Sequence, residues 1–174
     1  MFGDAVGLRA RTESDVPVLH AELYNDVAMR SRADNRAWTP VPVATSPYAV
    51  GVGSDTAAEF SVIERATEEL VGEAVLWEID RHNRCARLGL SLRPRFRGQG
   101  LGTDVVQVLA RYGFATLGLH RLQLETLADN GAMISAATKA GFQSEGLLRQ
   151  SAWVSGAFAD QVIMALLADE SPNL

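Results

Sequence analysis

The sequence has few of the residues that build covalently linked or metal-bound scaffolds. Its 174 residues include one cysteine, Cys85, which cannot form an internal disulfide and has no CxxC partner for zinc. No histidine stands at a metal-ligand spacing from a suitable partner, so we expect no metal site. A single unpaired thiol suits a reducing compartment, and we expect the protein in the cytoplasm.

Long apolar runs and excess positive charge are also missing. No hydrophobic stretch approaches the roughly 20 residues that span a bilayer, and residues 1–4 lack the basic and apolar start of a signal peptide, so we expect no membrane partner. The formal net charge of −5 repels polyphosphate, which disfavours nucleic-acid binding. With 47% hydrophobic and 21% charged residues, the composition is typical of one globular domain, which we assign to residues 1–174 with residues 7–170 structured.

The hydrophobic pattern changes its period along the chain. The first half alternates apolar and polar residues as antiparallel strands do, whereas residues 100–120 have helical spacing. Residues 31–53 contain three prolines and no clear period, so we expect a long loop or broken helices there. The predicted strands span 7–12, 59–64, 71–79, 84–93, 121–127, 147–154 and 162–167, and the predicted helices span 16–27, 100–120 and 132–140.

The order of these elements predicts an α/β (α+β) fold. The strand that contains Leu88 and the strand that ends at Leu127 are joined through a helix. Such a crossover makes two strands parallel neighbours, whereas the other connections are short enough for antiparallel pairs. The sequence therefore predicts a single mixed sheet, mostly antiparallel, with a central parallel pair and helices on both faces.

Three alternating glycines, Gly98, Gly100 and Gly102, follow a predicted strand and open a predicted helix. Glycine lets backbone N–H groups approach a ligand, and the first N–H groups of a helix attract anions such as phosphate. A Walker A loop would need a lysine after Gly102, where Thr103 stands, and a dinucleotide fingerprint would need a glycine at position 103. The remaining pattern is Arg97-x-x-Gly100-x-Gly102, and a tight strand-to-helix joint is its structural alternative.

This pattern resembles the coenzyme A signature of the GNAT superfamily of N-acetyltransferases. A second match supports the resemblance, because Asn130 and then Lys139-Ala140-Gly141-Phe142 follow in the order and spacing of that family. Within the superfamily, residues 8–15, 80–90 and 146–160 are similar to the enzymes that acetylate the N-terminal alanine or serine of ribosomal proteins. The resemblance covers nearly the whole chain.

The resemblance implies that acetyl-CoA is the cosubstrate and that the central parallel strands splay apart to bind it. Backbone N–H groups freed by the splay would hold the pantetheine and polarise the thioester carbonyl, and the glycine loop would hold the diphosphate. Carried over residue by residue, the cofactor-binding positions are Leu90, Leu92, Arg93, Arg97, Gly98, Gln99, Gly100, Leu101, Gly102, Thr103 and Asn130.

The resemblance also implies direct attack of a primary amine on the thioester within a ternary complex, and here the sequence departs from the family pattern. Arg87, Met133 and Ala152 stand where relatives carry polar groups. Two carboxylates remain as catalytic candidates that relay a proton through water. If the hairpin turns at residues 82–83, Glu73 lies opposite Leu92 on the same face. Glu125 lies near the end of the neighbouring strand, and the alternative for either residue is a solvated or salt-bridged carboxylate.

The acceptor is left open between a peptide N-terminal amine and small molecules such as an amino acid, a polyamine-like metabolite or an aminoglycoside-like compound. An exposed C-terminal hairpin could support a homodimer. Because three polar groups of the family pattern are missing, the alternative function is a non-catalytic module that binds acyl-CoA as a sensor or assembly partner.

Overall fold

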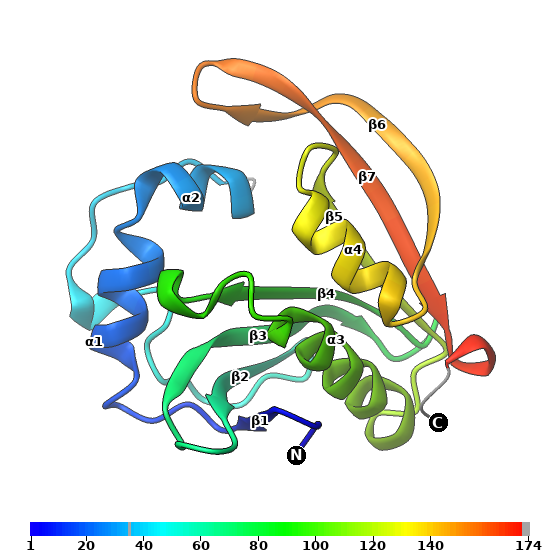
Figure 1. Cartoon of the computed structure of the whole chain (residues 1–174), viewed down its shortest axis with the longest axis horizontal. Helices are drawn as coiled ribbons and strands as arrows, with labels where there is room; N and C mark the ends of the chain where they lie inside the picture. Colours follow the sequence, from blue (N-terminus) through cyan, green and yellow to red (C-terminus); the bar gives the residue numbers. More distant parts are fainter. Residues whose placement is uncertain (35, 172–174) are drawn as a thin grey trace.

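A mixed sheet forms the centre of the structure, a computed structural model that describes residues 1–34 and 36–171. Within these residues the strand order is β1-β2-β3-β4-β5-β7-β6 (Figure 1). Only β4 and β5 are parallel, and all other neighbours are antiparallel. The predicted fold class is confirmed. The strands are β1 (Val6–Arg9), β2 (Ala57–Glu64), β3 (Leu70–Asp80), β4 (Cys85–Leu92), β5 (Arg121–Leu127), β6 (Gln143–Val154) and β7 (Ala157–Leu167).

Helices connect the strands and cover both faces of the sheet. α1 (Val16–Leu19) continues as a π-helical turn (His20–Tyr24) and is followed by α2 (Val27–Ala33). α3 (Leu101–Arg111) also ends in a π-helical turn (Tyr112–Thr116), and α4 (Gly131–Lys139) follows β5. None of the helices in the described ranges is long and apolar enough to cross a membrane. The predicted loop at 31–53 includes the last residues of α2 and a short 3-10 turn (Val43–Thr45), and its residue 35 lies outside the described residues.

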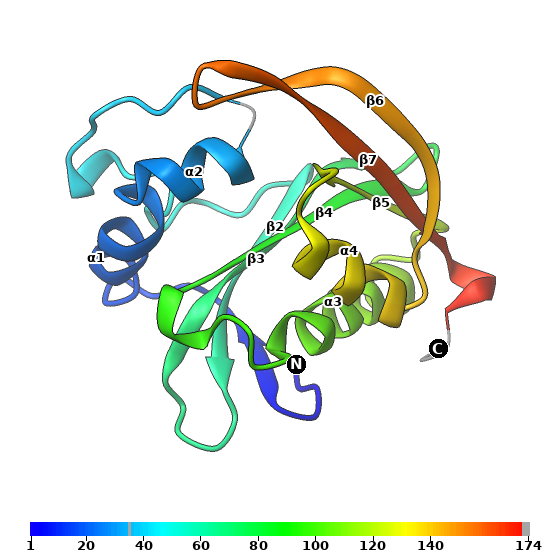
Figure 2. The same cartoon turned by 45° about the horizontal axis from the view of Figure 1, so that its top comes forward.

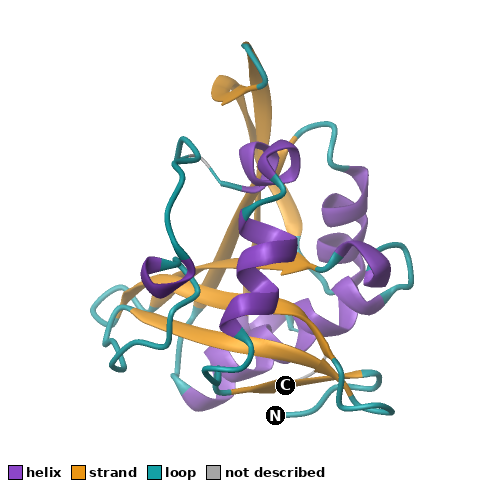
Figure 3. Cartoon of the chain, turned by 90° about the vertical axis from the view of Figure 1, so that its left-hand side faces the viewer, coloured by secondary structure: helices purple, strands orange, loops and turns teal. Residues whose placement is uncertain are grey.

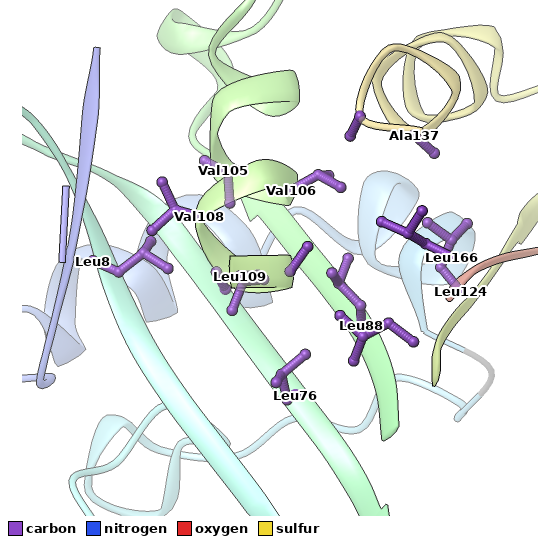
Figure 4. Packing of buried hydrophobic residues seen from close by; sticks show 14 of the residues in the cluster. Leu8, Leu76, Leu88, Val105, Val106, Val108, Leu109, Leu124, Ala137 and Leu166 are labelled. Atoms are coloured by element: carbon purple, nitrogen blue, oxygen red, sulfur yellow. The ribbon is translucent and has the colours of Figure 1, made fainter. Parts of the chain in front are cut away.

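The main core lies between α3 and the sheet. Val105, Val106, Val108 and Leu109 follow the helical spacing i, i+1, i+3, i+4, and each is no more than 1% exposed. Figure 4 shows them over Leu8, Leu76 and Leu88, with Ala137 of α4 above Leu124 and Leu166. Full burial of one such aliphatic side chain contributes about 1.5–3 kcal/mol. This packing fixes the N-terminus of α3 at the end of β4.

The opposite face of the sheet is covered by α1 and its π-helical turn (Figure 3). Ser61 of β2 donates a hydrogen bond of 2.8 Å to Asp15, which precedes α1, so Ser61 and its cross-strand partner Glu73 point to this side. A smaller apolar cluster of Leu19, Leu23, Tyr24 and Tyr48 fills the space above it.

The register between β3 and β4 differs from the prediction by one residue. Glu73 pairs with Ser91, and not with Leu92 as the turn position predicted. The cause is a bulge between Trp77 and Asp80, where Glu78 has a φ of 50°. Because one residue of slip moves a side chain to the other face, Glu73 points away from the leucines of β4 and toward the α1 side.

Candidate functional site

The two parallel strands separate partway along their length. β4 and β5 pair only from Cys85 with Arg121 to Arg87 with Gln123, although β4 continues to Leu92 and β5 to Leu127. The Arg93 N–H donates to the Val71 carbonyl at 2.8 Å. Hydrogen-bonded and non-hydrogen-bonded residues alternate along an antiparallel strand. Because Arg93 is hydrogen-bonded to β3, the backbone N–H and C=O groups of Leu90 and Leu92 point away from β3 and into this opening.

A cavity of about 380 Å³ occupies the opening and extends from the glycine loop to α2. Its walls come from β4, the start of α3, one face of α4, α2 and Tyr48. In Figure 1, α2 and α4 lie on opposite sides of the end of β4. Of the cofactor-binding residues predicted from the sequence, Leu90, Leu92, Arg97, Gly98, Gly100, Gly102, Thr103 and Asn130 line this cavity.

The glycine loop presents open backbone to the cavity. Gly98 and Gly100 have φ values of 73° and 81°, a conformation that side chains with a Cβ rarely adopt. A Cβ built at either position would meet nothing within 4 Å. Gly100 is also the N-cap of α3, so unpaired N–H groups and the positive end of the helix dipole face the same space. The loop therefore fits an anionic group such as a diphosphate.

Two cationic side chains stand beside the loop. Arg97 and Lys139 both line the cavity. The Arg97 Nε donates to the Leu92 carbonyl at 2.8 Å, which leaves its terminal nitrogens for other partners. Its Nη1 lies 4.0 Å from an Asp26 carboxylate oxygen at the start of α2. These charges complement a phosphorylated ligand.

Asn130 and the end of α4 have the local geometry that their sequence pattern suggests. Asn130 caps α4, because its Oδ1 accepts from the Met133 N–H at 3.3 Å. Gly141 adopts a φ of 101° just after the helix. The Phe142 N–H then donates to the Ala137 carbonyl and the Gly141 N–H to the Thr138 carbonyl, each at 3.0 Å, which is a Schellman motif. Both caps hold α4 along the cavity wall.

Three predicted cofactor-binding residues lie outside the cavity lining. The Arg93 N–H is paired with Val71, so the prediction that it is free for a ligand is wrong. The Arg93 guanidinium is buried against Glu22, with Nε 3.0 Å from a carboxylate oxygen. Gln99 is exposed, and its Nε2 donates to the Arg95 carbonyl. Leu101 is 7% exposed and belongs to the core, as its place on the inner face of α3 requires.

Glu73 lies behind the β4 wall of the cavity. Its Oε2 is 3.3 Å from Nη2 of Arg11, a buried arginine whose Nη1 is 3.2 Å from Glu59. Burial raises the pKa of the Glu73 carboxyl above its ordinary value, although Arg11 and Arg30 act in the opposite direction. Its cross-strand partner Ser91 lines the cavity. Glu73 is therefore a poorly solvated carboxylate next to the site.

Glu125 lies in the splayed part of β5 but is held by other side chains. Its Oε1 is 2.5 Å from Nη1 of Arg87 and accepts from Gln123 at 3.2 Å. Arg87 also binds Glu78, with Nε 2.6 Å from the carboxylate. The arginine that departs from the family pattern thus forms an ion-pair bridge across the splay.

Tyr48 and Ser135 are cavity-lining residues that the sequence analysis did not identify. Tyr48 is 3% exposed, and its hydroxyl accepts from Nη1 of Arg30 at 3.1 Å. Burial and the charge of Glu73 raise the pKa of the Tyr48 hydroxyl. Tyr48 belongs to residues 31–53, which have no hydrophobic period, so the sequence does not indicate that Tyr48 lines the cavity. The helical spacing of α4 could have identified Ser135, which shares a face with Ala132 and Ala136.

Comparisons with known proteins agree with this geometry. A model of the acetyltransferase (GNAT) domain matches residues 6–143. The uncharacterized N-acetyltransferase p20 of Bacillus licheniformis is 33% identical over 114 residues, which cover 66% of this chain and 64% of p20. YoaA of Bacillus subtilis, another uncharacterized N-acetyltransferase, is 26% identical over 170 residues, 94% of both chains. The crystal structure of spermidine N-acetyltransferase from Vibrio cholerae with CoA and spermine superposes with a TM-score of 0.85 at 22% identity, covering 95% of this chain and 97% of that one.

Proposed function

The chain belongs to the acetyltransferase (GNAT) domain family, whose model matches residues 6–143, and we propose that it moves an acetyl group from acetyl-CoA to a primary amine by direct attack within a ternary complex. The observation that carries this proposal is the end of β4–β5 pairing at Arg87 and Gln123, with the cavity and the glycine loop in the resulting opening.

The cavity residues fit acetyl-CoA as the donor substrate. The backbone at Gly98 and Gly100, with Arg97 and Lys139, suits the diphosphate because the N–H groups and the cations converge on open space. The backbone groups of Leu90 and Leu92 face the opening, where an N–H can polarise the thioester carbonyl.

The transfer requires one bond to form, one to break and two protons to move. The neutral amine nitrogen attacks the acetyl carbon, a C–N bond forms, and the C–S bond breaks to release the thiolate. The amine proton passes to Glu73 through water, because a carboxyl with a raised pKa is a stronger base than an ordinary glutamate. The phenol of Tyr48, protonated at neutral pH, passes its proton to the thiolate, and the proton held by Glu73 replaces it, so that the free thiol leaves and both side chains return to their starting states. Glu125 remains a weaker candidate for the base, since Arg87 neutralises it.

Release of free thiol from acetyl-CoA, measured with a panel of primary amines, tests the proposal. We expect thiol release that depends on both the amine and the protein. The alternative, a non-catalytic acyl-CoA-binding module, is favoured by Arg87, Met133 and Ala152 at positions where relatives carry polar groups. Coenzyme A binding without thiol release for any amine would support that alternative.

Three finer properties belong to the same proposal. The resemblance of residues 80–90 and 146–160 to ribosomal-protein acetyltransferases makes a peptide N-terminus one candidate acceptor.

We propose a homodimer formed through the β6–β7 hairpin, where Trp153 and Phe158 are 62% and 63% exposed and stack edge to face. A cytoplasmic location is proposed on the single free cysteine.

A further inference from the structure

The acceptor side of the cavity has a chemical character of its own. We infer that the acceptor is a primary amine with one positive charge on an apolar body, and not a polyamine such as the spermine in the structural relative. This inference rests on the proposed transfer to an amine. It starts from the observation that, within residues 1–34 and 36–171, no aspartate or glutamate lines the cavity.

The charged residues that do line the cavity are all cationic. Arg97 and Lys139 stand at the glycine loop, where phosphate groups of the donor would balance their charge. Arg30 stands on the opposite wall, on α2, with its side chain 12% exposed. A second ammonium group on the acceptor would therefore meet like charge at the cavity wall and no carboxylate in the lining to pair with.

Six carboxylates beside the lining residues already have arginine partners, and Asp104, next to Thr103, is held by the backbone N–H groups of residues 4–6. The pairs of Asp26 and Asp129 are partly or largely exposed and screened by water, so they attract an ammonium group weakly. At Glu73 or Glu22, an ammonium group would displace the guanidinium of Arg11 or Arg93, which is 5% or 8% exposed and too buried to find water instead. Breaking such a pair leaves an uncompensated buried charge. The pairs are Glu22–Arg93, Asp26–Arg97, Asp34–Arg30, Glu73–Arg11, Glu125–Arg87 and Asp129–Arg32.

Apolar side chains make up much of the remaining wall, together with the neutral polar side chains of Tyr48, Ser91, Thr103, Asn130 and Ser135. Leu23, Met29 and Ala33 lie on the side of α2, and Leu90 and Met133 lie on the side of β4 and α4. Met29 remains 39% exposed, so apolar surface is present for a ligand to cover. An alkyl or aryl substituent gains from this contact in proportion to the apolar area it buries, whereas a hydrated ammonium loses solvation there.

A matched pair of amines tests the inference. Hexylamine and hexamethylenediamine have the same carbon chain, and only the diamine has a second charge. We expect kcat/KM for hexylamine to exceed that for hexamethylenediamine, and that for spermidine, by about tenfold or more. Equal or faster acetylation of the diamine or of spermidine would overturn the inference while leaving the proposed transfer intact.

The substitution Met29→Glu supplies the anionic partner that the wall lacks. Position 29 is the third residue of α2, where a glutamate is compatible with the helix N-terminus. We expect M29E to raise the ratio of kcat/KM for the diamine over hexylamine by about tenfold, relative to M29Q, which adds a polar group without charge. No change in this ratio would contradict the inference.

Thermal melts of the coenzyme A complex separate this inference from the proposed function. If coenzyme A binds and no amine is acetylated, the proposed transfer is wrong. The melting temperatures of the complex with each amine then test the acceptor inference independently of catalysis. Greater stabilisation by hexylamine than by hexamethylenediamine supports it. Equal stabilisation, stronger stabilisation by the diamine, or no effect of either amine overturns it.

Discussion

Glu73 is the single residue on which the proton path depends most. Its carboxyl is buried beside Arg11, and its pKa is raised by that burial. We predict that E73Q lowers kcat by about 100-fold, as expected for loss of a general base. In the parent protein, kcat/KM should fall at acid pH partly because Glu73 becomes protonated, at a pH above the ordinary glutamate pKa. E73Q should lose this part of the pH dependence and keep the part that comes from protonation of the amine.

E125Q is the matched comparison, because Glu125 is held by Arg87 and Gln123. We expect a change in kcat of less than about threefold for this variant, well below the loss expected from removing a general base. An unchanged pH profile in E73Q would exclude Glu73 as the proton acceptor.

Asp15 carries the clearest dependence of stability on pH. Burial of this carboxyl is outweighed by hydrogen bonds from Arg9 at 2.6 Å, the Thr12 N–H at 2.9 Å and the Ser61 hydroxyl at 2.8 Å, so its pKa is lowered. A lowered pKa stabilises the fold above the unfolded value of about 3.9, and this contribution is lost as the pH falls toward the folded value. We predict that D15N lowers the free energy of unfolding by about 3 kcal/mol at neutral pH.

Urea unfolding at several pH values tests this prediction. The difference between D15N and the parent protein should shrink below about pH 4. Asp55→Asn is the control, since Asp55 is 95% exposed and its pair with Arg81 contributes little. A D15N difference that is constant from neutral to acid pH would show that the charge of Asp15 is not what stabilises the joint between β1 and α1.

At the level of elements, the glycine loop can be tested against a glycine of the same conformation elsewhere. Gly98 and Gly118 have φ values of 73° and 67°, and a Cβ at either would meet nothing within 4 Å. Substitution by alanine should therefore lower the free energy of unfolding of each variant by a similar amount, about 1–2 kcal/mol, through backbone strain. We predict that only G98A weakens coenzyme A binding, by about tenfold or more, because only Gly98 lines the cavity.

Calorimetric titration with coenzyme A, together with thermal melts of both variants, provides the measurement. Equal affinities in G98A and G118A, at matched loss of stability, would contradict the assignment of the loop to the diphosphate.

The elements also show what the sequence can and cannot predict. Residues 121–127 form β5 as predicted, because alternation and flanking turn signals are local properties. The Asn130 cap and the Gly141 conformation are local in the same way. The bulge at Glu78 is not a local property that the sequence shows. Counting residues from the turn predicts the register only where the strands pair without a bulge. That one residue reversed the direction of Glu73.

Contacts between distant segments were also beyond the sequence. Tyr48 reaches the cavity from a segment without periodicity, and Arg87 meets Glu125 only because β4 and β5 lie side by side. The backbone of Arg93 was predicted to be free, but the ladder alternation pairs it with Val71. Sequence patterns thus located the glycine loop and the caps of α4, and tertiary packing determined the rest of the cavity lining.

For the whole molecule, the superfamily and the enzyme class inferred from the motifs, an N-acetyltransferase that uses acetyl-CoA, are confirmed. The ribosomal-protein subfamily stays a prediction. The β6–β7 hairpin projects from the rest of the fold (Figure 3) and reaches toward α2 (Figure 2). Its exposed Trp153 and Phe158 form an apolar surface that a second copy could cover.

We predict that the parent protein sediments as a dimer and that the double variant W153S/F158S sediments as a monomer with an unchanged melting temperature at low concentration. Analytical ultracentrifugation distinguishes the two states. A monomeric parent protein, or a double variant that remains dimeric, would contradict the proposed role of the hairpin.

The most direct test of the central claim follows the acetyl group itself. The protein is mixed with an equimolar amount of acetyl-CoA, with and without hexylamine, and the quenched mixtures are examined by mass spectrometry. Direct transfer within the cleft predicts an unmodified protein in both mixtures and acetylated hexylamine only in the second. An acetyl group on the protein that passes to the amine, or an amine that stays unmodified in the presence of bound acetyl-CoA, would contradict the account.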